Sequence, residues 1–189
     1  MKTRNFAKGL LFGASLLLAS AAFAGEKGSV KLYEDVKVNG KTLTANAATA
    51  DTLLTVLRDQ FLLTGAKRGC NQGVCGACSV LADGRLVRSC LSLALDCDDR
   101  GIDTIEGLTN QPVMQALQRA FIARGAFQCG FCTPAMLVAS FALLHSNPKP
   151  SELEVRRALS GNYCRCTGYK KIVEAVLEAA ARVFAEASA

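Results

Sequence analysis

The sequence predicts an α+β fold, and three observations support this prediction. The chain has 189 residues, of which 50% are hydrophobic and 20% charged, so it can bury a core. Its first half contains short apolar segments separated by turn residues, which is typical of strands. Its second half contains apolar residues at helical spacing. We therefore expect strands with one helix over residues 28–105, followed by an all-α bundle over residues 106–186.

The first 24 residues are typical of a signal peptide. A basic start precedes an uncharged run at 9–23, and Ala22-Phe23-Ala24 is a small-residue cleavage pattern. The run is short for a membrane span, and an uncleaved N-terminal anchor is the alternative. Residues 3–8 are similar to a twin-arginine export motif in which Thr3 replaces the first arginine. We expect a periplasmic protein, exported by that route or together with a partner.

The predicted strands are separated by two turn signals. Asn39-Gly40 favours a type I′ hairpin turn, and Asp83-Gly84 lies in a second turn of the same kind. Between them, Asp51 is a candidate helix cap, followed by Leu54, Leu57 and other residues at helical spacing. Glu106-Gly107 is expected to end the first domain. The expected strands are 30–38, 41–44, 79–81, 86–89 and 102–105.

The predicted helices of the second half have local start and stop signals. Gly125 is a left-handed position after a helix that begins at Pro112. Thr133-Pro134 suits a cap followed by the first helical position. Ser151 and Glu154 form a capping box, and the helix that they start is expected to end at Gly161. The expected helices are 112–124, 133–145, 151–161 and 169–185.

The composition excludes several function classes. The chain has nine cysteines but one histidine, which argues against a histidine-based catalytic or zinc site. Residues 1–24 carry three cations and no acids, so their removal lowers the formal net charge from +6 to +3. A charge this small is not typical of nucleic-acid binding, and we expect no nucleic-acid partner.

Eight of the nine cysteines form two sets of four. The first set is Cys70, Cys75, Cys78 and Cys90, and its first three members have the spacing of plant-type ferredoxins. Gly69, Gly73 and Gly76 let the backbone turn its amides toward the sulfurs. The second set is Cys129, Cys132, Cys164 and Cys166, in QCGFCTP and NYCRCTGY. These lie near expected helix ends, where unpaired amides favour thiolates.

The two motifs, with DTIEGL at 103–108 between them, are similar to those of the small iron-sulfur subunits of the xanthine oxidase family of molybdenum hydroxylases. The resemblance covers about residues 30–180 and extends to the small subunits of periplasmic aldehyde and isoquinoline oxidoreductases. It implies a β-grasp, plant-type ferredoxin-like domain over 28–105 whose 2Fe-2S cluster is held by the first cysteine set. It implies a helical domain over 106–186 whose 2Fe-2S cluster is held by the second set. It also implies that Gln128 contacts the molybdopterin cofactor, which a large partner subunit holds.

The resemblance implies an electron-transfer subunit of an oxidoreductase, with no catalytic residue of its own. Electrons from an aldehyde or N-heterocycle would leave the partner's molybdopterin site and pass through both clusters to a c-type cytochrome or a flavin subunit. The alternatives are a stand-alone two-cluster ferredoxin and a structural metal-binding or disulfide module. The odd cysteine count and the unusual intervals argue against the structural alternatives. Cys97 is expected to be a small buried core residue.

Overall fold

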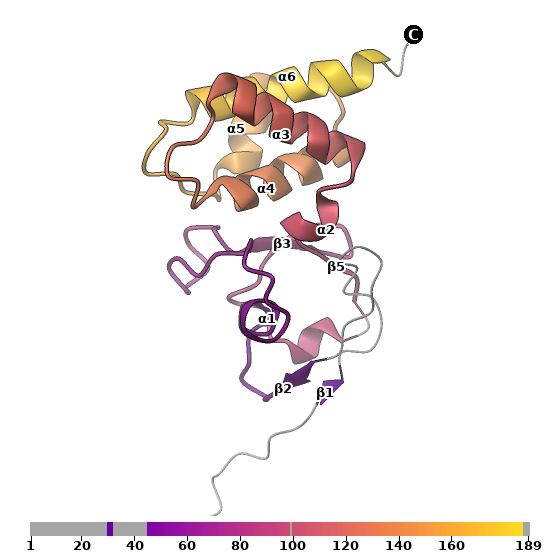
Figure 1. The fold of residues 1–189 in the computed structure, drawn as a ribbon, viewed down its shortest axis with the longest axis vertical. Coiled ribbons are helices and arrows are strands. Elements are labelled where there is room, and N and C mark those ends of the chain that lie inside the picture. The colour runs from indigo at the N-terminus through magenta and orange to yellow at the C-terminus, as the bar shows by residue number, and fades with distance from the viewer. Residues whose placement is uncertain (1–29, 32–44, 99, 187–189) are drawn as a thin grey trace, which may run out of the picture.

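The computed structural model describes residues 30–31, 45–98 and 100–186 of the chain. In this part, two small antiparallel sheets lie in the N-terminal half, and helices fill the C-terminal half (Figure 1). The prediction of a mixed fold of helices and small sheets is confirmed. The expected signal peptide at 1–24 and the expected turn at Asn39-Gly40 lie outside the described residues. Among the residues that are described, no helix is both long and apolar enough to cross a membrane.

Both sheets are antiparallel. The smaller one pairs β1 (Val30–Lys31) with β2 (Asn46–Ala47). In the larger one, β3 (Ser79–Ala82) lies between β4 (Arg85–Arg88) and β5 (Ile102–Asp103). The turn between β3 and β4 has positive φ at both central residues, 50° at Asp83 and 75° at Gly84, as the Asp-Gly pair predicts. Because residues 32–44 are not described, the β-grasp topology implied for 28–105 stays a prediction.

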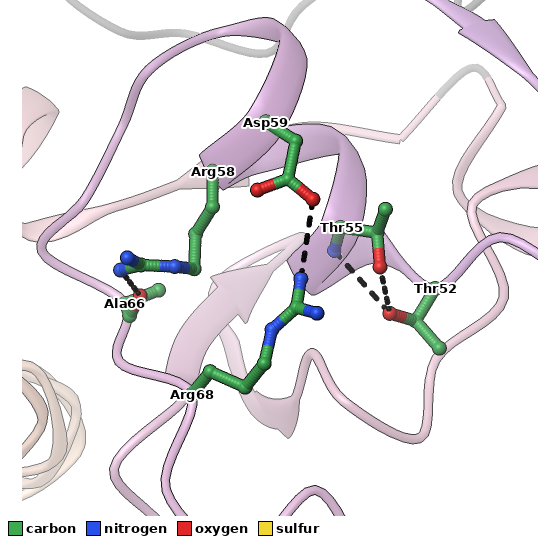
Figure 2. Close-up of polar contacts among 6 residues, drawn as sticks. All are labelled: Thr52, Thr55, Arg58, Asp59, Ala66 and Arg68. Atoms are coloured by element: carbon green, nitrogen blue, oxygen red, sulfur yellow. Dashed lines mark hydrogen bonds and ion pairs between the residues drawn. The ribbon is translucent and has the colours of Figure 1, made fainter.

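The helix predicted after Asp51 is present but differs in two respects. It begins as α1 (Leu53–Thr55) and continues as a π-helix, η1 (Val56–Gln60). Its cap is Thr52, whose Oγ1 accepts a hydrogen bond from the Thr55 N–H at 3.3 Å (Figure 2). The assignment of Asp51 as cap is therefore wrong, because its carboxylate accepts a hydrogen bond from an upstream backbone N–H instead. A 3₁₀ turn, η2 (Leu95–Cys97), precedes β5.

The helices of the second half are α2 (Ile105–Leu108), α3 (Pro112–Arg124), α4 (Thr133–Ser146), α5 (Glu152–Leu159) and α6 (Lys170–Glu186). The four longer ones lie close to their predicted bounds. The strand predicted at 102–105 is shorter than expected, because β5 ends at Asp103 and Ile105 already begins α2, while the domain boundary at Glu106-Gly107 stays a prediction. One helical turn therefore follows β5 directly and leads into α3 (Figure 1).

Most of the predicted caps are confirmed. Gly125 ends α3 with a left-handed φ of 57°, and the Ser151–Glu154 capping box makes both of its hydrogen bonds. The start of α4 lies one residue earlier than predicted, because Cys132 occupies the cap and Thr133 is already helical. This difference places a cysteine of the second set directly at a helix N-terminus.

The sheet separates two hydrophobic clusters. Leu81 of β3 packs among the helices, while Val80 and Ala82, on the opposite face of the strand, pack with Leu53 and Leu57. Cys78 and Cys90 belong to the second of these clusters. The helices form a bundle beside the larger sheet: α4 contacts β3, and α3 packs along α6 on the far side of α4 (Figure 1). This arrangement brings the ends of β3 and β4 close to the loops of the helical half.

Candidate metal centres

The loop that carries Cys70 is anchored at its start by an arginine from the π-helix. Arg58 donates from Nη1 to the carbonyl oxygens of Thr64 and Ala66, both at 2.9 Å. Figure 2 shows this side chain reaching Ala66, beside the exposed ion pair of Arg68 with Asp59. At the base of the loop, the backbone N–H of residue 67 donates to the carbonyl of residue 77 at 2.9 Å. The loop between η1 and β3 is therefore held by hydrogen bonds at its start and at its base.

Within the loop, backbone amides point at sulfur, as the glycines predicted. The N–H groups of Cys75 and Gln72 donate to the Sγ of Cys70 at 3.3 and 3.4 Å. These hydrogen bonds favour the thiolate and lower the pKa of Cys70 to about 6. The N–H of Cys70 donates in return to the Sγ of Cys75 at 3.4 Å. Such N–H···S contacts are the environment in which iron-sulfur clusters are held.

The other two cysteines of the first set are buried at the ends of strands. Cys78 directly precedes β3 and Cys90 follows β4. Burial and, after it, the hydrogen bond with Cys78 raise the pKa of the Cys90 thiol to about 11. Cys90 also senses the charge of Cys70 and accepts a backbone hydrogen bond from Gly73. The structure therefore brings the four predicted cysteines of the first set together.

The second set is assembled from two loops of the helical half. The Sγ atoms of Cys129 and Cys166 are 3.6 Å apart. The thiols of Cys132 and Cys164 are hydrogen-bonded to each other, and the Sγ of Cys164 lies 3.1 Å from the Oγ1 of Thr167. In the sequence, 31 residues separate Cys132 from Cys164, and the packing of the helices brings the two segments together.

The expectation that helix ends favour thiolates in this set is wrong for Cys132. Although this residue caps α4, burial raises the pKa of its thiol to about 12. For Cys164, burial opposes ionisation, but hydrogen bonds with Thr167 outweigh it and lower the pKa. The protonation state of each thiol thus depends on its own burial and hydrogen bonds.

A cavity of about 210 Å³ lies between the two sets. Six of the eight cysteines contribute to its wall: Cys70, Cys75, Cys129, Cys132, Cys164 and Cys166. The backbone is close to sulfur here, because a Cβ at Gly69 would lie 2.8 Å from the Sγ of Cys75. Within the described part of the chain, no three His, Cys, Asp or Glu side chains are arranged to hold a single metal ion. Four thiols in each set, amide donors to sulfur and the shared cavity fit 2Fe-2S clusters.

Gln128 lies at the surface beside the second set. Its Nε2 donates to the carbonyl oxygen of Cys166 at 3.1 Å. Its neighbours Phe127 and Phe131 are 42% and 47% exposed, which is unusual for phenylalanine. Exposed aromatic side chains around a polar residue are typical of protein interfaces. The predicted contact of Gln128 with a pterin stays a prediction.

Cys97 is a core residue, as predicted. It is 4% exposed, its Sγ donates to the carbonyl of Leu93 at 3.3 Å, and burial raises its pKa. It packs in the same hydrophobic cluster as Cys78 and Cys90.

Four side chains that shape the two sites were not expected from the sequence. Arg58 anchors the first loop, and Arg88 and Asn162 join the two loops. The hydroxyl of Tyr169 accepts from the N–H of Cys164 at 2.7 Å and donates to the carbonyl of Asn162 at 3.0 Å. Asn162 and Tyr169 belong to the GNYCRCTGY segment, so their position beside Cys164 was the available signal.

Comparison with known proteins agrees with this geometry. The chain matches the family model of a 2Fe-2S iron-sulfur cluster binding domain over residues 36–104 and that of a [2Fe-2S] binding domain over residues 104–177. It is 50% identical to the nicotine 6-hydroxylase small subunit of Paenarthrobacter nicotinovorans over 149 residues, which cover 79% of this chain and 90% of the relative.

Solved structures give the same result. Quinoline 2-oxidoreductase from Pseudomonas putida 86 matches with a TM-score of 0.73 and 43% identity, over 80% of this chain and 94% of that chain. Aldehyde oxidoreductase from Desulfovibrio gigas matches with a TM-score of 0.71 and 43% identity, over 78% of this chain but 17% of that chain.

The fold and the two cysteine sets therefore define the class of protein, an iron-sulfur subunit of an oxidoreductase. More specifically, the chain belongs to the small 2Fe-2S subunits of the xanthine oxidase family of molybdenum hydroxylases. Several of its relatives are named as small or iron-sulfur subunits, and its role within this family is electron transfer.

Proposed function

We propose that this chain holds two 2Fe-2S clusters and passes electrons singly from the molybdopterin site of a large partner subunit to an external acceptor. Cys70, Cys75, Cys78 and Cys90 hold one cluster; Cys129, Cys132, Cys164 and Cys166 hold the other. One observation carries this proposal: six of these eight cysteines line a single cavity. In addition, the backbone N–H of Tyr163 donates to the carbonyl of Cys75 at 2.8 Å, which joins the two sets directly.

Each 2Fe-2S cluster supplies a one-electron carrier. The residues of the chain bind it and adjust its charge. N–H groups of Cys75 and Gln72 stabilise negative charge on the Sγ of Cys70, and Thr167 does the same for Cys164. Hydrogen bonds to sulfur favour the reduced, more negative state and raise the reduction potential. Both sites therefore contain groups that prepare them to receive an electron.

The second set is the side that docks on the large subunit. Gln128 and the exposed rings of Phe127 and Phe131 lie next to Cys129 and Cys132, and we assign Gln128 to the contact with molybdopterin. The match to 17% of the Desulfovibrio gigas aldehyde oxidoreductase chain supports association with a larger protein part, since in that protein the corresponding part belongs to a longer polypeptide.

The first set then faces the acceptor. Val74 and Leu91 are 74% and 63% exposed beside it, and an apolar rim of this kind suits a small electron-transfer interface. We propose a c-type cytochrome as the acceptor, with a flavin subunit as the alternative. The acceptor follows from the export pattern in residues 1–24, from which we also propose a periplasmic location.

For the substrate of the assembled enzyme we propose an N-heterocycle or an aldehyde. The names of the relatives support both, because nicotine and quinoline are N-heterocycles and the third similar protein is an aldehyde oxidoreductase. The substrate pocket belongs to the large subunit, so this chain contributes electron transfer and not substrate recognition.

The experiment is a pair of cysteine variants in the complex coexpressed with its large subunit. Cys129→Ser removes one thiolate of the second set and should abolish turnover with an external acceptor while the large subunit stays folded. Cys97→Ala is the matched control, since Cys97 is a buried core residue outside both sets, and it should leave turnover and iron content unchanged. Unchanged turnover in Cys129→Ser would contradict the electron relay.

A further inference from the structure

Two polar side chains connect the cysteine sets across the boundary between the sheet and the helices. Arg88, at the end of β4, donates from Nη1 to the Oγ of Ser79 at 2.5 Å and from Nη2 to the carbonyl of Gly161 at 2.6 Å. Asn162 is 1% exposed and donates from Nδ2 to the carbonyl of Gly76 at 3.1 Å and to the Oγ of Ser79 at 3.3 Å. The Ser79 hydroxyl donates to the same Gly76 carbonyl at 2.6 Å. These residues form one hydrogen-bonded group, buried at Ser79 and Asn162 and half-buried at Arg88, which we call the Arg88–Asn162 clamp.

Each part of the clamp lies next to a cysteine of one of the sets. Gly76 directly follows Cys75, and Ser79 directly follows Cys78. On the other side, Asn162 lies two residues before Cys164. A displacement of the clamp is therefore a displacement of the cysteines of one set relative to those of the other.

The loop of the first cysteine set and the loop of the second set are in close contact at two glycines, Gly76 and Gly161. A Cβ at Gly76 would lie 2.3 Å from the carbonyl oxygen of Gly161, and a Cβ at Gly161 would lie 2.4 Å from the Nη2 of Arg88. A further hydrogen bond fixes the turn that carries Asn162: the carbonyl of Asn162 accepts a hydrogen bond from the hydroxyl of Tyr169 at 3.0 Å. Because the turn at residues 161–162 packs tightly against the loop at Gly76, a shift of one cysteine set moves the other.

We propose that Arg88 and Asn162 are positioning residues that fix the separation and orientation of the two cluster sites, and thereby the rate of electron transfer between them. The inference rests on the proposed function, since it concerns the step between the two clusters. Hydrogen bonds from a charged donor such as Arg88 contribute more than neutral ones, so their loss weakens the contact between the two loops. Neither residue binds a cluster, so their loss alters the relation between the sites and leaves each site's four cysteines in place.

The test uses the complex with the large subunit and variants of both residues. Arg88→Met and Asn162→Ala remove the hydrogen bonds of the clamp. Arg88→Lys keeps the charge but replaces the bidentate guanidinium by a single ammonium group. We therefore expect this variant to restore part of the magnetic interaction and of the transfer rate. Arg85→Met is the matched control, because Arg85 is exposed at the other end of the same strand.

Three quantities are measured on each variant: iron per chain, the magnetic interaction between the two reduced clusters by electron paramagnetic resonance, and the rate of electron transfer between them after rapid mixing with substrate. We expect about four iron atoms per chain throughout, as two 2Fe-2S clusters require. In Arg88→Met and Asn162→Ala, the magnetic interaction should weaken and the transfer rate should fall clearly below that of Arg85→Met. The KM for substrate should not change, because the substrate binds to the large subunit.

The outcomes separate this inference from the proposed function. If the clamp variants keep the wild-type magnetic interaction and transfer rate, as Arg85→Met should, the clamp has no positioning role. If the wild-type complex itself lacks two 2Fe-2S signals, the proposed function fails whatever the clamp variants do. Should Arg88→Met not assemble, Arg88→Lys and Asn162→Ala decide the matter, since they keep the charge or the arginine.

Discussion

A single methyl group at residue 76 tests how closely the two halves of the protein are joined. Gly76 has a φ of 71°, and an added Cβ would lie 2.3 Å from the carbonyl oxygen of Gly161 and 3.0 Å from the Cα of Asn162. Gly84, in the turn between β3 and β4, has nearly the same φ, 75°, but an added Cβ would meet nothing within 4 Å. The pair Gly76→Ala and Gly84→Ala therefore shares the backbone strain and differs in the steric conflict.

The expected magnitudes follow from these contacts. Left-handed strain costs a residue with a Cβ about 1–2 kcal/mol, and this is the whole cost expected for Gly84→Ala. In Gly76→Ala the two backbones must also separate, which breaks the hydrogen bond from Arg88 to Gly161 and the one from Asn162 to Gly76. With about 1.5–3 kcal/mol for the charged donor and about 0.5–1.5 kcal/mol for the neutral one, the total loss, backbone strain included, should be about 3–6.5 kcal/mol.

The assay is guanidinium unfolding of the two variants and the wild type at equal iron content. Far-ultraviolet circular dichroism follows the helices, and visible absorption follows the clusters. We expect the midpoint of Gly76→Ala to lie well below that of Gly84→Ala, with cluster loss preceding loss of helix. Equal midpoints for the two variants would refute the close packing of residue 76 against residues 161 and 162.

Three further predictions concern single side chains. Arg58→Met removes two hydrogen bonds to the start of the first cysteine loop and should cost about 1.5–3 kcal/mol, with selective loss of the first cluster's paramagnetic signal; Arg68→Met, which breaks only an exposed ion pair, should cost less than about 1 kcal/mol, and equal effects would contradict the anchoring role. Leu117→Ala, at a fully buried position of α3, should lower the free energy of unfolding by about 2–5 kcal/mol, and a loss below about 1 kcal/mol would show that α3 is not packed as described. Ser151→Ala removes the cap of α5 and should cost about 1 kcal/mol in thermal unfolding, whereas no change would show that the capping box contributes nothing.

Features set by local chemistry could be predicted from the sequence. Pro112 and Gly125 bound α3, and Ser151 with Glu154 starts α5, because these residues act within one turn of the chain. The Asp83-Gly84 turn follows for the same reason. Cysteine spacing was likewise enough to divide eight thiols into two sets that the structure brings together.

Features set by contacts between distant segments could not be predicted. Ile105 was expected at the end of a strand but begins α2, where the carboxylate of Glu106 accepts the N–H of Gly65 at 2.8 Å. Arg58 lies in the π-helix η1 and binds the carbonyl of Ala66, a contact that helical periodicity does not predict. Arg88 bonds to Gly161 across 73 residues, so its role depends on how the two halves pack. Burial raises the pKa of Cys132, although its position at the start of α4 was expected to favour the thiolate.

The central claim is that two 2Fe-2S clusters form an electron path through this chain. The most direct measurement is iron analysis with electron paramagnetic resonance of the dithionite-reduced complex, purified without oxygen together with its large subunit. The account predicts about four iron atoms per chain and two distinct 2Fe-2S signals that interact magnetically. Zinc in place of iron, or oxidised cysteine pairs without metal, would contradict it and indicate a structural role for the two cysteine sets.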